Sequence, residues 1–383
     1  MFQRRFALLG MTLLSLPLGL QASAGSDGST AGMDSFSFLT QAEGVFQSQV
    51  VLAPDGTTLL VWAQRGADGI DLFAATRSGS DAFSDPVQVN REPINSYTGD
   101  EARPDVAIGQ DGAVAIAWTA ADMNMMLALG QDHGRSFSAP LRMNQDGGEA
   151  ARTMPVVAFS SDGAVHGVWL DARGAPPRRE EPANLYYARI EGDRVKEINL
   201  TADQEASVCG CCRPFIAIDA RDGVDIAFRN TTAEGYRDIF LIEGNANGEF
   251  TQPRAASSPL WLIPGCPSVG PVFLDGLALW KDGSQSYWRL LSASSPSAEP
   301  EVVLEDTQGV LTLTFAPRRI SGSDDLVLVG GAPQGFILKR AGEGWEVASE
   351  DVPEWASSGA LIDGKLTLVG NAEGRLRVQQ THL

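Results

Sequence analysis

The chain has 383 residues, 43% of them hydrophobic, and its 29 basic and 48 acidic residues give a formal net charge of −19. This composition is sufficient for a large buried core. So much negative charge repels nucleic acids and anionic membranes, so neither is expected as a partner. The 41 glycines and 21 prolines indicate many turns.

Residues 1–24 have the layout of a secretory signal peptide. Arg4 and Arg5 precede an apolar run over residues 6–20, and an Ala-Ser-Ala pattern at residues 22–24 is typical of a signal-peptidase site. The apolar run is too short for a good membrane span. We therefore expect export to the periplasm or beyond, no membrane contact after cleavage, and a net charge of −21 once the two arginines are removed.

One repeated pattern runs through residues 35–383, which we interpret as a single domain after a Gly- and Ser-rich flexible leader at 25–34. Each copy is an apolar strand, an Asp-Gly turn and a second apolar strand, often followed by a third strand and a short fourth. Four antiparallel strands per repeat predict an all-β fold, a β-propeller of four-stranded blades. The Asp-Gly turns lie at residues 55–56, 111–112, 162–163, 222–223, 275–276 and 363–364, with a weaker copy near Asp324.

These copies favour seven blades, although six blades stay open because the last two copies are degenerate. The final repeat supplies three strands and then the chain stops. An apolar strand at residues 36–39 is expected to complete that blade, because closure by both termini removes an exposed sheet edge. We expect such a closed ring to be a monomer.

Two motifs carry a resemblance to a known family. The turn over residues 130–137, GQDHGRSF, resembles the Asp-box of sialidase-like β-propellers, Ser/Thr-x-Asp-x-Gly-x-Ser/Thr-Trp/Phe, with Gly130 in place of the first Ser/Thr. The fourth repeat, CGCCRPFIAIDARDG, resembles exported bacterial members that carry Cys-x-Cys-Cys before an inner strand. The resemblance implies the fold, but it brings no established activity.

Sialidase activity in that family implies three arginines for the substrate carboxylate, a Tyr–Glu nucleophile pair and an Asp acid. Arg103, Arg152 and Arg213 open three consecutive inner strands, but this distribution over blades does not match the family, and Arg-Ile-Pro is absent from the sequence. Tyr236, Asp238 and Glu101 could serve in catalysis, yet none lies in a motif. A sialidase-like glycoside hydrolase therefore stays an alternative, and no catalytic residue is assigned.

Propeller geometry places the Asp-Gly turns and the Asp-box turns on one face. The links between blades lie on the other face, where the channel mouth would take a small ligand, a glycan or a metal. His133 and His166 are not expected as ligands, and the methionines near residue 125 are as compatible with packing as with Cu(I). Trp62, Trp118 and Trp169 recur at one strand position and predict inter-blade packing. The candidate ligand-binding residues at the mouth are Arg103, Arg152, Arg213, Asp171, Arg173, Tyr236, Arg237 and Asp238.

Four cysteines are the main functional signal. Cys209, Cys211 and Cys212 lie in the link into the fourth blade, and Cys266 lies at the corresponding point of the fifth, so all four should meet at the mouth. An even count in an oxidising compartment favours two disulfides. Three cysteines within four residues make strained bridges, however, and clustered thiolates suit the soft ions Cu(I) and Zn(II).

Three hypotheses follow from the sequence. The preferred one is an exported binding propeller with a cysteine site for a soft metal such as copper. The second is the sialidase-like hydrolase, active or degenerate. The third is an interaction scaffold whose cysteines only staple two loops.

Overall fold

The structure is a computed structural model. It describes residues 43–79, 82–95, 99–148, 150–174, 182–204, 207–232, 234–245, 247–256, 269–274, 277–283, 288–293, 299–306, 312–313, 317–342 and 344–383. These residues belong to one compact unit, Asp34–Leu383. The predicted signal peptide, the leader, the strand at 36–39 and Cys266 lie outside the described residues. In the part of the chain just named, no helix has the length and apolar character that crossing a membrane requires.

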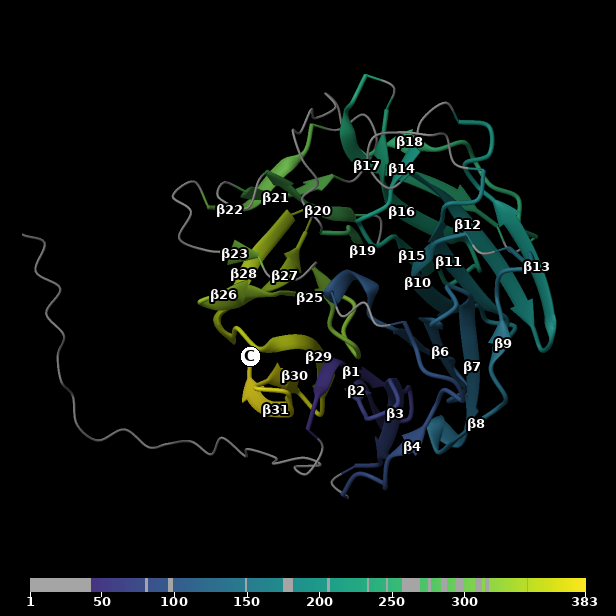
Figure 1. Ribbon diagram of the computed structural model, residues 1–383. Coiled ribbons are helices and arrows are strands. Elements are labelled where there is room, and N and C mark those ends of the chain that lie inside the picture. The colour runs from purple at the N-terminus through teal and green to yellow at the C-terminus, as the bar shows by residue number, and fades with distance from the viewer. Residues whose placement is uncertain are drawn as a thin grey trace, which may run out of the picture. The chain divides into compact units, whose positions relative to one another are not determined.

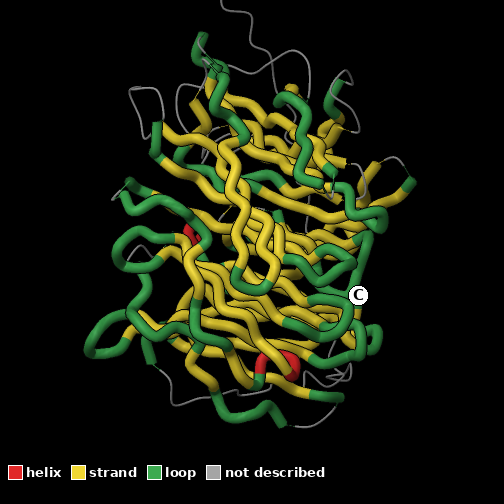
Figure 2. The backbone as a smooth tube through the Cα atoms, turned by 90° about the vertical axis from the view of Figure 1, so that its right-hand side faces the viewer, coloured by secondary structure: helices red, strands yellow, loops and turns green. Residues whose placement is uncertain are grey.

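The described chain is built of antiparallel sheets that follow one another along the sequence, as predicted (Figure 1). The first sheet has the order β1-β2-β3-β4, and in the second β5-β6-β7 is extended by β8 and β9. Helical structure in these sheets is limited to the short turns η1 and η2 (Figure 2). The bounds are β1 Val45–Leu52, β2 Thr58–Arg65, β3 Ile70–Arg77, β4 Val87–Gln88, η1 Asp100–Ala102, β5 Asp105–Ile108, β6 Val114–Thr119, β7 Met125–Gln131, η2 Asp132–Gly134, β8 Ser136–Phe137 and β9 Leu141–Arg142.

The third and fourth repeats are joined into one larger sheet by a short strand that the sequence pattern did not predict. This strand, β14, pairs with β12 of the third repeat and with β16 of the fourth. The link carrying the first cysteine is therefore partly a strand. The bounds are β10 Arg152–Phe159, β11 Val165–Asp171, β12 Pro182–Glu191, β13 Arg194–Asn199, β14 Ser207–Cys209, β15 Phe215–Ile218, β16 Val224–Thr231, β17 Arg237–Gly244 and β18 Arg254–Ala255.

The C-terminal part adds three more main sheets, β19-β20-β21-β22, β24-β25-β27-β28 and β29-β30-β31, and a two-stranded pair of β23 with β26. The bounds are β19 Val272–Leu274, β20 Leu277–Gly283, β21 Trp288–Ala293, β22 Glu301–Asp306, β23 Thr312–Leu313, β24 Arg318–Arg319, β25 Leu326–Val329, β26 Gly331–Ala332, β27 Gln334–Ala341, β28 Gly344–Pro353, β29 Ala356–Ile362, β30 Lys365–Ala372 and β31 Arg375–His382.

The described Asp-Gly turns lie where predicted, but most differ from the expected type, and the predicted turn at 275–276 lies outside the described residues. We expected positive φ at both residues, as in two-residue hairpins. At residues 55–56, 111–112 and 162–163 only the glycine has positive φ, and the aspartate accepts the N–H of the residue after the glycine. Of the Asp-Gly turns that the structure describes, only the one at 363–364 has positive φ at both residues, 51° and 74°. The aspartate thus stabilises three of these turns through its side chain.

The hydrophobic core lies between sheets that are neighbours along the chain. Apolar faces of the first and second sheets pack together, and the same holds for each following pair. One further cluster joins the last sheet back to the first, with Val50 and Trp62 against Ile362 and Leu376. Trp62, Trp118 and Trp169 all lie in these inter-sheet clusters, which confirms their predicted packing role.

Candidate functional site

The turn at residues 130–137 lies against the first Asp-Gly turn, which agrees with the predicted placement of these two turns on one face. His133 Nε2, from that turn, lies 3.0 Å from Asp55 Oδ2 of the first Asp-Gly turn. A cavity of about 540 Å³ is formed by the links and loops of other elements, and its wall includes Arg152, Asp171 and Cys211. The structure therefore brings Arg152 and Asp171, two of the predicted ligand-binding residues, to the same cavity as Cys211.

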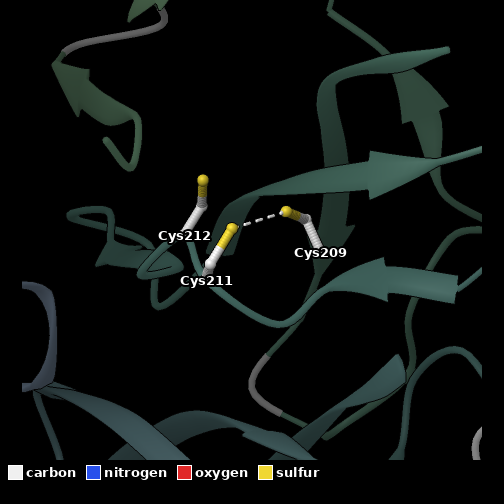
Figure 3. A group of neighbouring side chains, drawn as sticks. All are labelled: Cys209, Cys211 and Cys212. Atoms are coloured by element: carbon white, nitrogen blue, oxygen red, sulfur yellow. Dashed lines mark hydrogen bonds between the residues drawn. The ribbon is translucent and has the colours of Figure 1, made fainter. Parts of the chain in front are cut away.

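The three described cysteines form a compact group. Cys209 ends β14, and Cys211 and Cys212 follow in the turn that leads to β15. Their sulfur atoms all lie within 4.8 Å of one another, and Cys209 Sγ lies 3.2 Å from Cys211 Sγ (Figure 3). Cys209 and Cys212 are buried, whereas Cys211 is partly exposed. Through the short strand β14, the first cysteine is paired with Pro182 of β12.

The oxidation state of these cysteines differs from both simple expectations. Cys209 and Cys212 are thiols rather than half-cystines, which differs from the two-disulfide alternative. Cys211 is disulfide-bonded, so an open cluster of thiols is not the state described either. Three cysteines within four residues leave too little chain for bridges among themselves without strain.

The pKa values of the Cys209 and Cys212 thiols shift in opposite directions. A hydrogen bond from the Cys212 thiol lowers the pKa of Cys209, aided by the Cys211 N–H and by the positive charges of Arg229 and Arg237. The same bond to Cys209, together with burial, raises the pKa of Cys212. The pair therefore favours one thiolate, at Cys209, that is held by one thiol.

Two buried cations lie beside the thiols, and the sequence analysis missed both. Arg229 on β16 is 0% exposed and donates to the carbonyls of Arg237, Val269 and Lys281. Lys281 on β20 is 2% exposed, and burial followed by the charge of Arg229 lowers its pKa, while Cys212 opposes that shift. Arg229 Nε has no hydrogen-bond partner among the residues described. Such buried positive charge favours anions nearby, thiolates included.

A sequence signal for these cations exists. Each follows the large aromatic residue of a second strand, Phe228 or Trp280, at the position held by Ala63 and Leu170 in the first and third repeats. The two repeats whose links hold cysteines each have a charged residue within an otherwise apolar second strand. This pattern is the sequence signal that could have predicted the buried cations.

Arg152, Asp171 and Arg173 form a second polar group at the cavity. Arg152 and Asp171 are both 0% exposed, and Arg152 Nε lies 3.0 Å from Asp171 Oδ2. Asp171 also accepts from Trp169 Nε1, the Arg173 backbone and the Arg173 guanidinium, while Asp146 contacts both arginines. Arg173 in turn stacks on Tyr186, 4.1 Å from the ring centroid. Charge is balanced within this group.

Arg213 is buried and holds neighbouring links together. It donates to the carbonyls of Glu101, Arg103 and Pro155 and pairs with Asp105 Oδ1 at 2.8 Å. Glu101 Oε2 accepts the backbone N–H groups of Arg213, at 2.7 Å, and of Gly270, at 3.2 Å. One carboxylate thus connects the links into the second, fourth and fifth repeats.

The remaining predicted residues lie at the β16–β17 hairpin. Tyr236 closes its turn through backbone bonds with Thr232, and Arg237 and Asp238 begin β17. Arg237 is close enough to Cys209 to lower its pKa, whereas buried Asp238 accepts the N–H of Ile239 at 2.8 Å. Of this trio, Arg237 acts on the cysteine cluster.

Comparisons with known proteins give structural neighbours at low sequence identity. An ulvan lyase of polysaccharide lyase family PL25, solved with a bound sugar unit, matches with a TM-score of 0.54 and 10% identity over 88% of this chain and 93% of that chain. A protein of unknown function from Dyadobacter fermentans has a TM-score of 0.48 and 13% identity over 80% and 93% of the two chains. The Hadza microbial sialidase Hz136 has a TM-score of 0.47 and 11% identity over 90% of this chain and 66% of its own.

No protein-family profile matches the chain, and no curated protein sequence matches it. The lyase shares the fold, which is all-β, and its 10% identity carries nothing further about this chain. Two sialidases and an arabinanase are also among the structural neighbours, each at 11% identity.

Proposed function

We propose that the chain is an exported seven-bladed β-propeller that binds a soft metal ion, Cu(I) in the first place, at its cysteine cluster. The observation that carries this proposal is the group of three sulfur atoms within 4.8 Å beside the buried cations Arg229 and Lys281. The blade count is supported by the core cluster that joins the last sheet to the first. Export is supported by the signal-like residues 1–24.

The residues present fit a soft, monovalent metal. Thiolates are the ligands that Cu(I) prefers, and Cys209, Cys211 and Cys212 can each offer one sulfur. Three thiolates around one Cu(I) leave a net negative charge, which the buried Arg229 and Lys281 offset. Zn(II) would need a fourth ligand for its tetrahedral geometry, and Cys266, predicted to reach this mouth, is the candidate.

Binding requires the reduced form. Because Cys211 is disulfide-bonded, its sulfur becomes a ligand only after that bond is cleaved. We propose Cys266 as its partner, since its position in the repeat predicts that it meets the cluster. Peptide mapping of the oxidised protein tests this pairing. A Cys211 peptide linked to any cysteine other than Cys266 would contradict it.

We favour metal binding over sialidase-like hydrolysis because the arginines required for a substrate carboxylate are engaged within the protein. Arg152 pairs with Asp171, and Arg213 pairs with Asp105 and three carbonyls. A small ligand or glycan at the mouth stays a second proposal, in which the partly exposed Arg173 and Arg237 would be the contacts.

The test is an anaerobic Cu(I) competition titration of the reduced protein against a chromogenic chelator. We expect about one equivalent bound tightly, and a loss of at least about 100-fold in the Cys209→Ser, Cys212→Ser variant. Arg229→Met should weaken binding about 10–100-fold, and the mouth control Arg173→Gln should leave it unchanged. Equal affinity in the cysteine variant and the wild type would overturn the proposal.

A further inference from the structure

Two methionines line the same cavity as Cys211. Met123 lies in the β6–β7 turn, and Met154 lies in the inner strand β10. Met123 is partly exposed, whereas Met154 is 3% exposed. The cavity wall therefore holds a partly exposed methionine, a buried methionine and the partly exposed Cys211.

Both methionines are held in a backbone conformation that long side chains rarely adopt. The φ angle is 66° at Met123 and 60° at Met154. For a bulky residue without a short polar side chain such a conformation is an outlier. Strain of this kind persists where the surrounding structure enforces it, and it is found most often at functional sites.

An internal comparison shows that Met123 occupies a position where glycine is the unstrained choice. In the β6–β7 turn, Ala120 and Asn124 are bonded at 2.8 Å, and the Met123 N–H bonds to the Ala120 carbonyl at 2.9 Å. The β16–β17 turn has the same two bonds, at 2.8 and 3.0 Å. The residue that corresponds to Met123 there is Gly235, with φ of 94°. Glycine adopts this conformation without penalty, so the fold alone does not require methionine here.

The Met123 thioether is also oriented. Asn95 Nδ2 donates to Met123 Sδ at 3.0 Å, and both residues line the cavity. Met154 interrupts the register of β10 against β11, between Thr153 and Val156. A side chain at an irregular point of an inner strand is directed differently from its neighbours in the strand.

We propose that this cavity is the route by which a soft cation reaches the cysteine cluster, with Met123 and Met154 as thioether ligands along it. The proposal rests on the proposed metal binding of the cluster. Thioethers bind Cu(I) and Ag(I) but hold them less firmly than thiolates, so a cation can pass from methionine to cysteine. The net charge of −19 favours the approach of any cation to the protein.

The first experiment isolates the thioethers from the cysteines. In the Cys209→Ser, Cys212→Ser variant, checked for folding by circular dichroism, Ag(I) is added to protein with methyl-¹³C-labelled methionine. The Met123 and Met154 methyl resonances should shift, and that of the fully buried core residue Met143 should not. Unshifted Met123 and Met154 resonances would overturn the route, whatever the cysteines bind.

The second experiment measures the rate of loading. In stopped-flow transfer of Cu(I) from a chelator to the reduced protein, Met123→Leu, Met154→Leu should load about tenfold more slowly, with its final affinity within about threefold of wild type. Met143→Leu is the matched control and should change neither. Unchanged loading in the double variant, or in Met123→Leu alone if the double variant does not fold, would overturn the route. Absence of Cu(I) binding in every protein would refute the proposed function, and the loading part of the route with it.

Discussion

Two groups of buried polar residues meet at the cavity, and they differ in how their charges are balanced. In the Arg152–Asp171–Arg173 group each cation faces a carboxylate, and Asp171 accepts bonds from an indole and two arginines. In the cysteine group, Arg229 bonds only to carbonyls among the described residues, and the nearby groups able to carry negative charge include two thiols. A balanced group needs no ligand, whereas the second can accept a soft cation once its thiols ionise.

The comparison predicts that the balanced group matters most for stability. Asp171→Asn leaves Arg152 buried without its charge partner, which we expect to cost about 3–5 kcal/mol of unfolding free energy. Urea unfolding measures this loss. The control is Glu197→Gln, which alters the ion pair of Arg173 with Glu197, a pair more exposed than that of Arg152 with Asp171. This change should cost about 1 kcal/mol or less of unfolding free energy. Equal losses in the two variants would show that burial does not distinguish the pairs.

The cysteine group should contribute to stability through Cys211 alone. Cys211→Ser in oxidising buffer should lose about 2–4 kcal/mol, because it removes a disulfide. A reductant should produce the same loss in the wild type and none in the variant. Differential scanning calorimetry with and without reductant measures both. A wild-type melting temperature that ignores reductant would contradict a stabilising bond at Cys211.

A third buried group, on the opposite side of the same sheet, sharpens the contrast through pH. His166 bonds to Ser160 Oγ at 3.0 Å and to the Tyr187 hydroxyl at 2.7 Å, and burial, followed by the charge of Arg189, lowers its pKa to about 4. The unfolded state, with a pKa near 6.5, is then protonated first as pH falls. Stability present above pH 6.5 is lost as pH approaches 4.

The expected size of this effect is on the order of 2 kcal/mol between pH 7 and pH 5. Urea unfolding of the wild type and His166→Gln at both pH values isolates it from the carboxylates. The variant should lose less than the wild type over this interval. Parallel pH profiles of the two proteins would mean that folding does not lower the pKa of His166.

Much of the fold could be predicted because the repeat carries its own signals. Apolar alternation and Asp-Gly turns located the first four hairpins and the third and fourth strands of the first three repeats, such as β12 and β13. β14 escaped prediction because three residues are too few to show a period. The turn types escaped it because an Asp-Gly pair fits both a two-residue turn and a longer one.

The sequence predicted where the cysteines of the candidate site lie along the fold, but it did not predict their oxidation state. Cys209, Cys211 and Cys212 were expected together because one link holds them, and their sulfur atoms lie within 4.8 Å of one another. Counting residues back from the Asp-Gly turns added Cys266, which lies outside the described residues. Which of the cysteines is bridged depends on three-dimensional distances that spacing does not give. The pairing of Arg152 with Asp171 likewise joins the start of one strand to the end of the next. Arg229 and Lys281 were missed because charges within strands were not compared between repeats.

The most direct test of the cysteine site is X-ray absorption at the copper edge of the reduced, Cu(I)-loaded protein. Our account predicts Cu(I) bound by sulfur alone, with three sulfur ligands in the wild type and fewer in Cys212→Ser. A ligand shell dominated by nitrogen or oxygen, or a spectrum unchanged by Cys212→Ser, would contradict the central claim that Cys209, Cys211 and Cys212 hold the metal.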